Sequence, residues 1–317
     1  MTVTQELHVI FGTGQAGAAT ARALAKAGRR IRVVNRSGQP NPWLPAGIEV
    51  RSADAADPAS AVAAAQGASV IYQCLNAPYN RWPEVFPGLQ AGVLQAAGDL
   101  GARLVVLENV YMYGLVDGPI TEDLPYRAQT RKGRVRAHMS RELIDAHERG
   151  KVQVAIGRAS DYYGPGVTAS ALGERTFRPL VTGRPAEIAG NADVPHSYAY
   201  IDDVGTGLAT LGMHDRAFGE IWHLPHAPAV SPRKMLDFAF EHLGLRPQIR
   251  TVGRTMLSIA GLFIPEARET VEMLYEFEEP FIVDNKKFSA AFGERVTPLR
   301  EGMLCTVDWY RDQQNRQ

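Results

Sequence analysis

Blocks of apolar residues alternate with longer, mixed blocks through the first half of the chain. The apolar blocks are short and rich in valine, isoleucine and leucine, as is typical of strands buried on both faces. The intervening blocks have the alanine-rich or amphipathic composition of helices. This alternation predicts an α/β fold with a doubly wound parallel sheet. Strands are predicted at residues 9–11, 31–35, 48–54, 69–75, 103–107 and 152–156, and helices at 15–27, from 57, at 89–100 and at 132–149.

The pattern changes after about Gly164, where proline and glycine become more frequent and the elements become shorter. Two later segments, 198–203 with the helix after it and 220–224, are predicted to return to the sheet. No repeat or low-complexity linker separates the halves, so we expect one interleaved unit. It would comprise a core of residues 1–161, joined by 198–225, and a smaller C-terminal substrate lobe of residues 162–197 and 226–317.

The first predicted strand runs into a glycine-rich turn. Gly12, Gly14 and Gly17 have the G-x-G-x-x-G spacing between a strand and a helix. The first glycine permits a tight turn, the second lets the backbone approach a pyrophosphate, and the third lets helix and strand pack closely. The free N–H groups at the helix start, at Gln15 and Ala16, would hold the phosphates. The turn therefore predicts a dinucleotide-binding Rossmann core; a glycine turn without a ligand is the alternative.

The residues that end the second predicted strand bear on the choice of cofactor. Asn35, Arg36 and Ser37 include no carboxylate that would repel a 2′-phosphate, and Arg36 offers a guanidinium to it. We therefore predict NADP, with NAD held through the backbone and a solvated Arg36 as the alternative. Asp54, after the third strand, either contacts the adenine amino group or caps a turn. The residues predicted to pass beside the cofactor riboses are Leu75, Asn76 and Ala77.

Composition narrows the class of protein. The 317 residues are 45% apolar and 21% charged, and 34 Lys and Arg balance 34 Asp and Glu. This neutrality argues against a nucleic-acid partner. Cys74 and Cys305 are too few for a disulfide framework or a zinc site, so no metal is predicted. The N-terminus lacks the features of a signal peptide, and no apolar stretch is long enough for a bilayer. We expect a cytoplasmic protein with a small-molecule substrate and no membrane partner.

Six motifs, taken in order and spacing, are similar to those of one family. They are Gly12–Gly17, Glu108–Gly114, Arg158–Gly166, His196–Val204, Gly219–Leu224 and Glu301–Tyr310. On these motifs the chain resembles an extended short-chain dehydrogenase/reductase of the NAD-dependent epimerase/dehydratase type over nearly its whole length. Members of that family often pair through helices flanking the fifth strand, so the resemblance implies a homodimer.

The chain departs from this family at the catalytic positions. Members carry a Ser or Thr after the fifth strand and a Tyr-x-x-x-Lys on the next helix. Here Asn109 stands at the Ser position, and the best alignment puts Lys132 and Arg136 at the Tyr and Lys positions. The chain therefore resembles atypical members that lack the usual residues. Some of those are ketoreductases with an altered acid, and others are NADP-sensing regulators without turnover.

The residues at these positions suggest substitute chemistry. Asn109 could polarise a carbonyl, or it could cap the strand. If strand geometry continues, Asn109, Tyr111 and Tyr113 project on one side, and Tyr111 could replace the missing acid with its pKa lowered by a nearby cation. Packing is the alternative for both tyrosines. Lys132 could donate a proton and Arg136 could hold a ribose hydroxyl, or the two could belong to a solvated basic face.

The substrate pocket is expected to include Tyr79, Tyr113 and Asp161, the last in place of a family asparagine that lies near the substrate. Aromatic residues of the later half, such as Tyr162 and Trp222, would suit a flat, hydrophobic molecule. The leading hypothesis is an NADPH-dependent reductase of a carbonyl on a small or mid-sized organic substrate. A non-catalytic NADP-sensing protein is one alternative. An epimerase or dehydratase is another, although the chain lacks the tyrosinate base that those reactions use.

Overall fold

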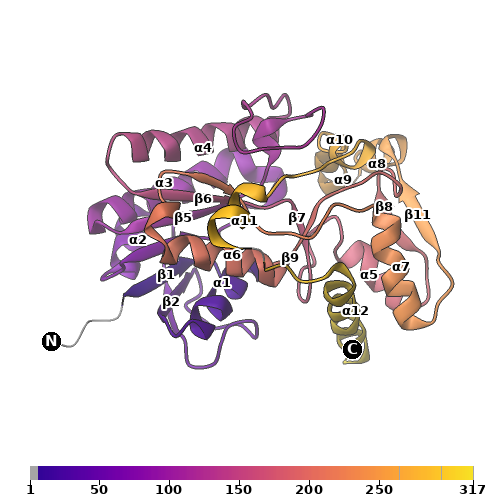
Figure 1. The fold of residues 1–317 in the computed structure, drawn as a ribbon, viewed down its shortest axis with the longest axis horizontal. Helices are drawn as coiled ribbons and strands as arrows, with labels where there is room; N and C mark the ends of the chain where they lie inside the picture. The colour runs from indigo at the N-terminus through magenta and orange to yellow at the C-terminus, as the bar shows by residue number, and fades with distance from the viewer. Residues whose placement is uncertain (1–5, 264, 294, 317) are drawn as a thin grey trace.

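A computed structural model describes residues 6–263, 265–293 and 295–316 of the chain. Its centre is a seven-stranded sheet, wholly parallel, with the order β10-β6-β5-β4-β1-β2-β3 (Figure 1). The order reverses between β1 and β4, which is the doubly wound arrangement predicted from the sequence. The strands are β1 (Leu7–Phe11), β2 (Arg30–Asn35), β3 (Glu49–Ser52), β4 (Val70–Gln73), β5 (Arg103–Glu108), β6 (Val154–Arg158) and β10 (Ile221–His223).

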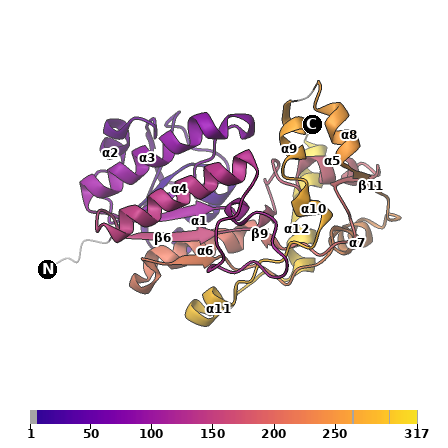
Figure 2. The ribbon, with the colours of Figure 1, turned by 90° about the horizontal axis from the view of Figure 1, so that it is seen from above.

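Helices cover both faces of this sheet (Figure 2). Val9 and Phe11 pack on one face against alanines and leucines of α2, α3 and α4. Ile10, between them, packs on the other face against α1 and α6. Successive side chains of a strand point to opposite faces, so a strand buried on both sides is continuously apolar. These helices are α1 (Gln15–Lys26), α2 (Pro58–Ala65), α3 (Trp82–Leu100), α4 (Arg131–Glu148) and α6 (Ile201–Met213).

The helix α3 begins seven residues before the predicted start at residue 89. Pro87 lies inside it and lacks the N–H of a helical residue, which made a later start plausible from sequence. The extra turns form because Trp82 and Phe86 are buried against Ala77 and Met139. Burial of two large aromatic side chains outweighs one missing hydrogen bond.

A smaller lobe packs beside the carboxyl ends of the strands. Its own core joins α5, α7 and α12 through residues such as Phe177, Phe240 and Val307. A parallel pair, β8 with β11, flanks this core. The lobe comprises α5 (Glu174–Val181), β8 (Ala186–Ala189), α7 (Pro232–Leu243), β11 (Ile249–Val252), α8 (Arg254–Ala260), α9 (Pro265–Val271), α10 (Tyr275–Glu278) and α12 (Leu299–Asn315).

The remaining elements are short. The helix α11 (Lys286–Phe292) returns from the lobe to the main sheet, where Phe288 and Phe292 contact Trp222 of β10. Among the described residues, no helix has both the length and the apolar character that a bilayer crossing requires. The short 3₁₀ turns are η1 (Tyr79–Arg81), η2 (Tyr111–Tyr113) and η3 (Asp215–Ala217).

One predicted strand lies elsewhere. Residues 198–203 were expected to enter the main sheet, but β9 (Tyr198–Tyr200) pairs in parallel with β7 (Asp161–Tyr163) in a separate two-stranded sheet. The position beside β6 is already filled by β10, whose Ile221 pairs with Ile156. The expectation for 220–224 is therefore confirmed. The prediction that residues 198–203 form a strand of the main sheet is wrong. The helix that follows, α6, does pack on the sheet as expected.

Candidate active site

The glycine turn has the geometry that its spacing predicts. Gly12 has φ +103°, and a Cβ there would lie 2.6 Å from the carbonyl oxygen of Cys74. A Cβ on Gly17 would overlap the carbonyl oxygen of Gly12. Gly14 is the N-cap of α1, and nothing lies within 4 Å of a Cβ placed on it. The turn therefore packs tightly underneath and is open above, as a phosphate at a helix N-terminus requires.

The end of β2 is organised by Asn35. Its Oδ1 accepts from Gly38 N at 2.7 Å and Ser37 Oγ at 3.2 Å, while its Nδ2 donates to Thr13 Oγ1 at 3.2 Å. Asn35 thus holds the loop after β2 against the glycine turn. Arg36 and Ser37 are exposed beside it. Asp54 is also exposed and accepts from Ala56 N at 3.0 Å, so its carboxylate caps a turn.

A cavity of about 380 Å³ opens where the carboxyl ends of the strands face the lobe. Ligands of open parallel sheets bind in this position. The predicted residue Ala77 is not among those that line the cavity, and its carbonyl accepts from Trp82 Nε1 at 3.1 Å. Most predicted site residues are among those that line it: Gly14, Gln15, Ala16, Leu75, Asn76, Tyr79, Asn109, Tyr111, Arg136 and Asp161.

Arg136 enters the cavity wall from α4 with unused hydrogen-bonding capacity. It is 2% exposed, and its Nη2 lies 3.6 Å from Glu108 Oε1. Its Nε and Nη1 are buried and have no hydrogen-bond partner among the described residues. Burial lowers the pKa of the Arg136 guanidinium, an effect that Glu108 opposes. Arginine nonetheless stays protonated in proteins, so Arg136 supplies two fixed donors and a positive charge.

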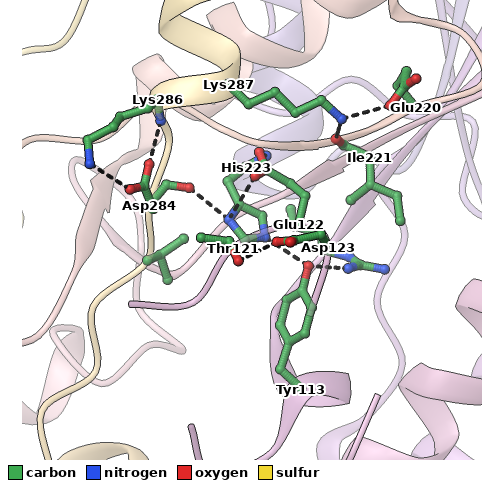
Figure 3. Close-up of polar contacts among 12 residues, drawn as sticks. Tyr113, Thr121, Glu122, Asp123, Glu220, Ile221, His223, Asp284, Lys286 and Lys287 are labelled. Atoms are coloured by element: carbon green, nitrogen blue, oxygen red, sulfur yellow. Dashed lines mark hydrogen bonds and ion pairs between the residues drawn. The ribbon is translucent and has the colours of Figure 1, made fainter. Parts of the chain in front are cut away.

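Tyr113 is not among the cavity-lining residues, contrary to expectation. The chain leaves β5 as the 3₁₀ turn η2, so strand alternation does not continue and Tyr111 and Tyr113 point differently. The Tyr113 hydroxyl accepts from Arg158 Nη1 and lies 2.9 Å from His223 Nε2. Because His223 Nδ1 donates to the Asp284 carbonyl at 2.9 Å, Nε2 must accept from Tyr113 (Figure 3). Tyr113 therefore supports the buried frame of the site.

Tyr111 does line the cavity, beside Tyr79. Burial raises the pKa of Tyr111 well above its ordinary value, and the neighbouring Tyr79, Glu276 and Asp161 raise it further. This direction is opposite to the lowering by a cation that the sequence suggested. The raised pKa favours Tyr111 as a neutral phenol, able to donate a hydrogen bond, over a tyrosinate.

Lys132 is fully buried and does not line the cavity. Its ammonium group contacts the carboxylate of Glu269, lies 2.7 Å from Glu272 Oε1, and sits 4.3 Å above the ring of Tyr79. Two carboxylates on the α9 side thus enclose the position where the family has its tyrosine. Lys132 therefore connects α4 to the lobe through its ion pairs with Glu269 and Glu272.

Two buried groups near Asp161 were not singled out from the sequence as site residues. Glu276 is 1% exposed, and neither carboxylate oxygen has a hydrogen-bond partner among the described residues. Burial, reinforced by Asp161, raises the pKa of Glu276 well above its ordinary value. His196 lies 3.0 Å from Asp161. Glu276 has no usable signal in the sequence, since it stands in an acidic run that looks solvated. His196, which opens the motif His196–Val204, was expected only as one of the lobe residues that complete the pocket.

Comparison with known families settles the relationship. The model of the NAD dependent epimerase/dehydratase family matches residues 9–223, which is more than half of the chain. The chain belongs to the NAD dependent epimerase/dehydratase family. The matched region runs from β1 to β10 and so contains the whole main sheet with its glycine turn. No curated protein matches the sequence.

Solved structures share the fold of this family member over almost the full length. UDP-glucuronic acid 4-epimerase from Bacillus cereus, in complex with NAD, is 16% identical, with a TM-score of 0.77 over 97% of this chain and 99% of that one. UDP-glucose 4-epimerase from Thermus thermophilus, also with NAD, is 16% identical, with a TM-score of 0.76 over 96% and 99%. An epimerase from Methanothermobacter thermautotrophicus is 17% identical, with a TM-score of 0.82 over 98% and 94%.

Proposed function

We propose that this protein binds a nicotinamide dinucleotide at the glycine turn and transfers hydride at an oxygen-bearing carbon of an organic substrate. One observation carries the proposal: a single cavity is lined both by the turn, at Gly14 and Gln15, and by the polar groups of Asn109, Tyr111 and Arg136. Hydride transfer requires a positioned cofactor together with donors to the substrate oxygen. Family membership supports the same chemistry.

The residues present fit such a cofactor. Gly14 leaves space above the first turn of α1, whose free N–H groups at Gln15 and Ala16 would hold the pyrophosphate. Asn76 would contact a ribose, and Arg136 would donate to a ribose hydroxyl or to the substrate oxygen. The cofactor would supply or accept the hydride. Relatives of known structure carry NAD, whereas the exposed Arg36 beside the turn suits the 2′-phosphate of NADP.

For the reaction, we favour internal oxidation and reduction of the epimerase or dehydratase kind. Family membership and the full-length similarity to two NAD-bound epimerases support it. In such a reaction a substrate hydroxyl is oxidised to a ketone. The hydride then returns either to the ketone carbon or, after water has been eliminated next to the ketone, to the new double bond, so the cofactor shows no net change. Asn109 and the neutral Tyr111 would hydrogen-bond the substrate oxygen in both forms.

Net reduction of a carbonyl is the second candidate. The chain lacks Tyr-x-x-x-Lys on α4, where Lys132 is enclosed by carboxylates and Tyr111 is held neutral. A site with neutral donors and no phenolate base suits a reaction in which hydride adds to a carbonyl carbon and a donor protonates the resulting alkoxide. Exposed Arg36 is consistent with NADPH, the usual donor for reductions.

One experiment separates these functions. The protein is titrated with NADH and NADPH by fluorescence, then incubated with panels of nucleotide sugars and ketones while cofactor absorbance and product NMR are followed. Inverted or dehydrated product with unchanged cofactor supports internal redox chemistry. One reduced cofactor consumed per alcohol supports net reduction. Tight cofactor binding without turnover favours the sensing alternative, and absence of binding overturns the proposal.

A further inference from the structure

Asp161 and His196 meet at the wall of the cavity. Asp161 is the first residue of β7 and lines the cavity. Its register partner in β9 is Tyr198, and His196 lies two residues before Tyr198 in the chain. His196 Nε2 lies 3.0 Å from Asp161 Oδ2. The two-stranded sheet that the sequence did not predict is thus the element that brings these residues together.

Aromatic rings hold the imidazole in one plane. The His196 ring is stacked on Phe277 with centroids 5.2 Å apart and 12° between planes, and on Phe281 at 5.0 Å and 21°. Tyr198 packs against it at 4.5 Å. With 1% of His196 exposed, the ring cannot tilt away from its partners. Both nitrogens therefore keep the partners that they have.

These partners determine how many protons the pair carries. His196 Nδ1 lies 3.1 Å from the carbonyl oxygen of Glu276, which only accepts, so Nδ1 must carry a hydrogen. Nε2 faces a carboxylate oxygen of Asp161. A hydrogen bond there needs a second proton, either on Nε2 or on the carboxyl group. The pair thus holds one proton more than a neutral imidazole beside an ionised carboxylate.

That extra proton is accessible to a molecule in the cavity. Asp161 Oδ1 makes no hydrogen bond to any residue that the structure describes, and the side chain is 17% exposed. Asn109 and Tyr111 line the same cavity, where a substrate oxygen would lie. The other acid candidates serve less well, since Lys132 is enclosed by carboxylates and does not line the cavity.

We infer that Asp161 is the proton-transfer residue of the hydride-transfer reaction. His196 is the positioning residue that holds the Asp161 carboxyl and shares the extra proton with it. This inference rests on the proposed function. As the carbonyl carbon gains a hydride from the reduced nicotinamide, the C=O π electrons move to oxygen. The oxygen then takes the one extra proton of the pair from Asp161; where that proton resides on Nε2 of His196, it first moves to the Asp161 carboxylate. The products are an alcohol, the oxidised cofactor, ionised Asp161 and neutral His196; oxidation is the reverse.

Other titratable groups face Asp161 but are neutral. Glu276 is buried beside it, and burial raises the pKa of its carboxyl well above the ordinary value. Burial also raises the pKa values of the surrounding phenols. The pair differs from these groups in its geometry, because it joins a carboxyl group that lines the cavity to an imidazole at hydrogen-bonding distance. The phenols are those of Tyr79, Tyr111, Tyr162 and Tyr198.

The first test counts the protons on the Asp161–His196 pair and does not depend on enzymatic turnover. Full-length protein with ¹⁵N-labelled histidine and ¹³C-labelled aspartate is studied by NMR at pH 7, in wild type and Asp161→Asn. We expect two protons over three positions: Nδ1, Nε2 and the Asp161 carboxyl. In the variant, the amide donates to Nε2 and leaves a neutral His196 protonated on Nδ1 alone. A wild-type pair with one proton over the three positions would overturn the inference.

The second test measures hydride transfer in a single turnover of cofactor-loaded protein with the substrate found above. We expect Asp161→Asn to slow it at least about 100-fold, the usual range for losing a general acid, with cofactor affinity unchanged. The control is Asp308→Asn, in the surface pair where His242 Nε2 lies 2.8 Å from Asp308. A wild-type rate in Asp161→Asn overturns this inference alone. A wild type that binds cofactor but transfers no hydride overturns the proposed function and the catalytic role together.

Discussion

Arg158 Nε donates to Glu108 Oε2 across 3.1 Å, and neither side chain is exposed. The two residues are register partners at the ends of the neighbouring strands β5 and β6. Arg136 approaches the same carboxylate from α4. Glu108 thus balances two buried guanidinium groups and fixes the cavity end of the sheet. A buried ion pair gives little net stability compared with apolar residues, but removing one partner leaves an uncompensated charge.

Replacing Glu108 by Gln should therefore destabilise the protein strongly. We expect the free energy of unfolding, measured by urea denaturation, to fall by about 3–5 kcal/mol. The control is Glu241→Gln, which removes the partner of Arg300 in an ion pair of 2.7 Å whose two side chains are both exposed, and it should cost about 1 kcal/mol or less. Equal effects of the two substitutions would show that the buried network is not a stabilising frame.

The glycine turn allows packing and ligand access to be tested separately. Gly14→Ala should leave stability nearly unchanged, because the added Cβ meets open space, yet it should weaken dinucleotide binding about tenfold or more by crowding the phosphates. Gly17→Ala should lower the thermal unfolding temperature, since its Cβ overlaps Gly12. Fluorescence titration and thermal melts measure the two effects. Unchanged affinity in Gly14→Ala would place the cofactor elsewhere.

The cofactor preference should depend on Arg36. If its exposed guanidinium binds the 2′-phosphate, Arg36→Ala weakens NADPH binding by about 10- to 100-fold and leaves NADH binding unchanged. The neighbouring exposed Arg51, paired with Glu49 at 2.8 Å, provides the control substitution. If Arg36→Ala weakens NADH and NADPH binding equally, or weakens neither, Arg36 does not bind the 2′-phosphate.

Stability should fall in mild acid because of buried histidines. Burial lowers the pKa of His223 to about 3 and that of His8 to about 4. Between those values and the unfolded value of about 6.5, the unfolded chain binds protons that the folded chain does not. The stability is therefore complete above about pH 6.5 and declines as the pH falls. From pH 7 to 5, His223 alone should account for about 2 kcal/mol.

Urea denaturation of His223→Gln at both pH values checks this expectation. The variant should show a pH dependence smaller by about that amount, even though its stability at pH 7 is also lower. Exposed His138 supplies the matched control, whose replacement by Gln should leave the pH dependence as in wild type. An unchanged slope in His223→Gln would mean that His223 is protonated in the folded protein.

Lys132 should matter for the attachment of the lobe. Lys132→Met removes the cation that Glu269 and Glu272 share, so we expect α9 to detach more often and limited proteolysis within residues 265–278 to speed up several-fold. Lys286→Met, at an exposed pair with Asp284, is the control. If cleavage is unaffected while hydride transfer is lost, Lys132 would instead be part of the chemistry.

Much of the fold was readable from the sequence because its determinants are local. The central strands of the main sheet, such as β1, β4 and β5, are short apolar runs, and the glycine spacing marks the first turn. Once a parallel sheet is predicted, the carboxyl ends of its strands must share one edge, which brings the neighbourhoods of Asn76, Asn109 and Asp161 together. The same rule explains why the cavity is lined by residues that follow strands, namely Tyr79, Asn109 and Tyr111. Arg136 lines it from α4.

The remaining features depend on contacts distant in sequence. Tyr113 turned away because η2 replaced an extended strand end, which its own residues do not signal. His196 lies 35 positions from Asp161, and the carbonyl of Glu276 lies 80 positions from His196. The pair therefore depends on β9 leaving the main sheet, which depends in turn on β10 filling the edge. No local pattern encodes such competition between strands.

The chain crosses between sheet and lobe several times, and this bears on how the protein assembles during synthesis. The first six strands, within residues 7–158, are consecutive and can pair as they leave the ribosome. The lobe's core is completed only when α12 has been made, because Met303, Val307 and Tyr310 of this helix join the cluster that holds Phe177 and Phe240, and Tyr310 stacks on Phe177. Until α12 has been synthesised, the nascent protein presents the parallel sheet beside an incomplete apolar core of the lobe, the stage at which a chaperone would be needed.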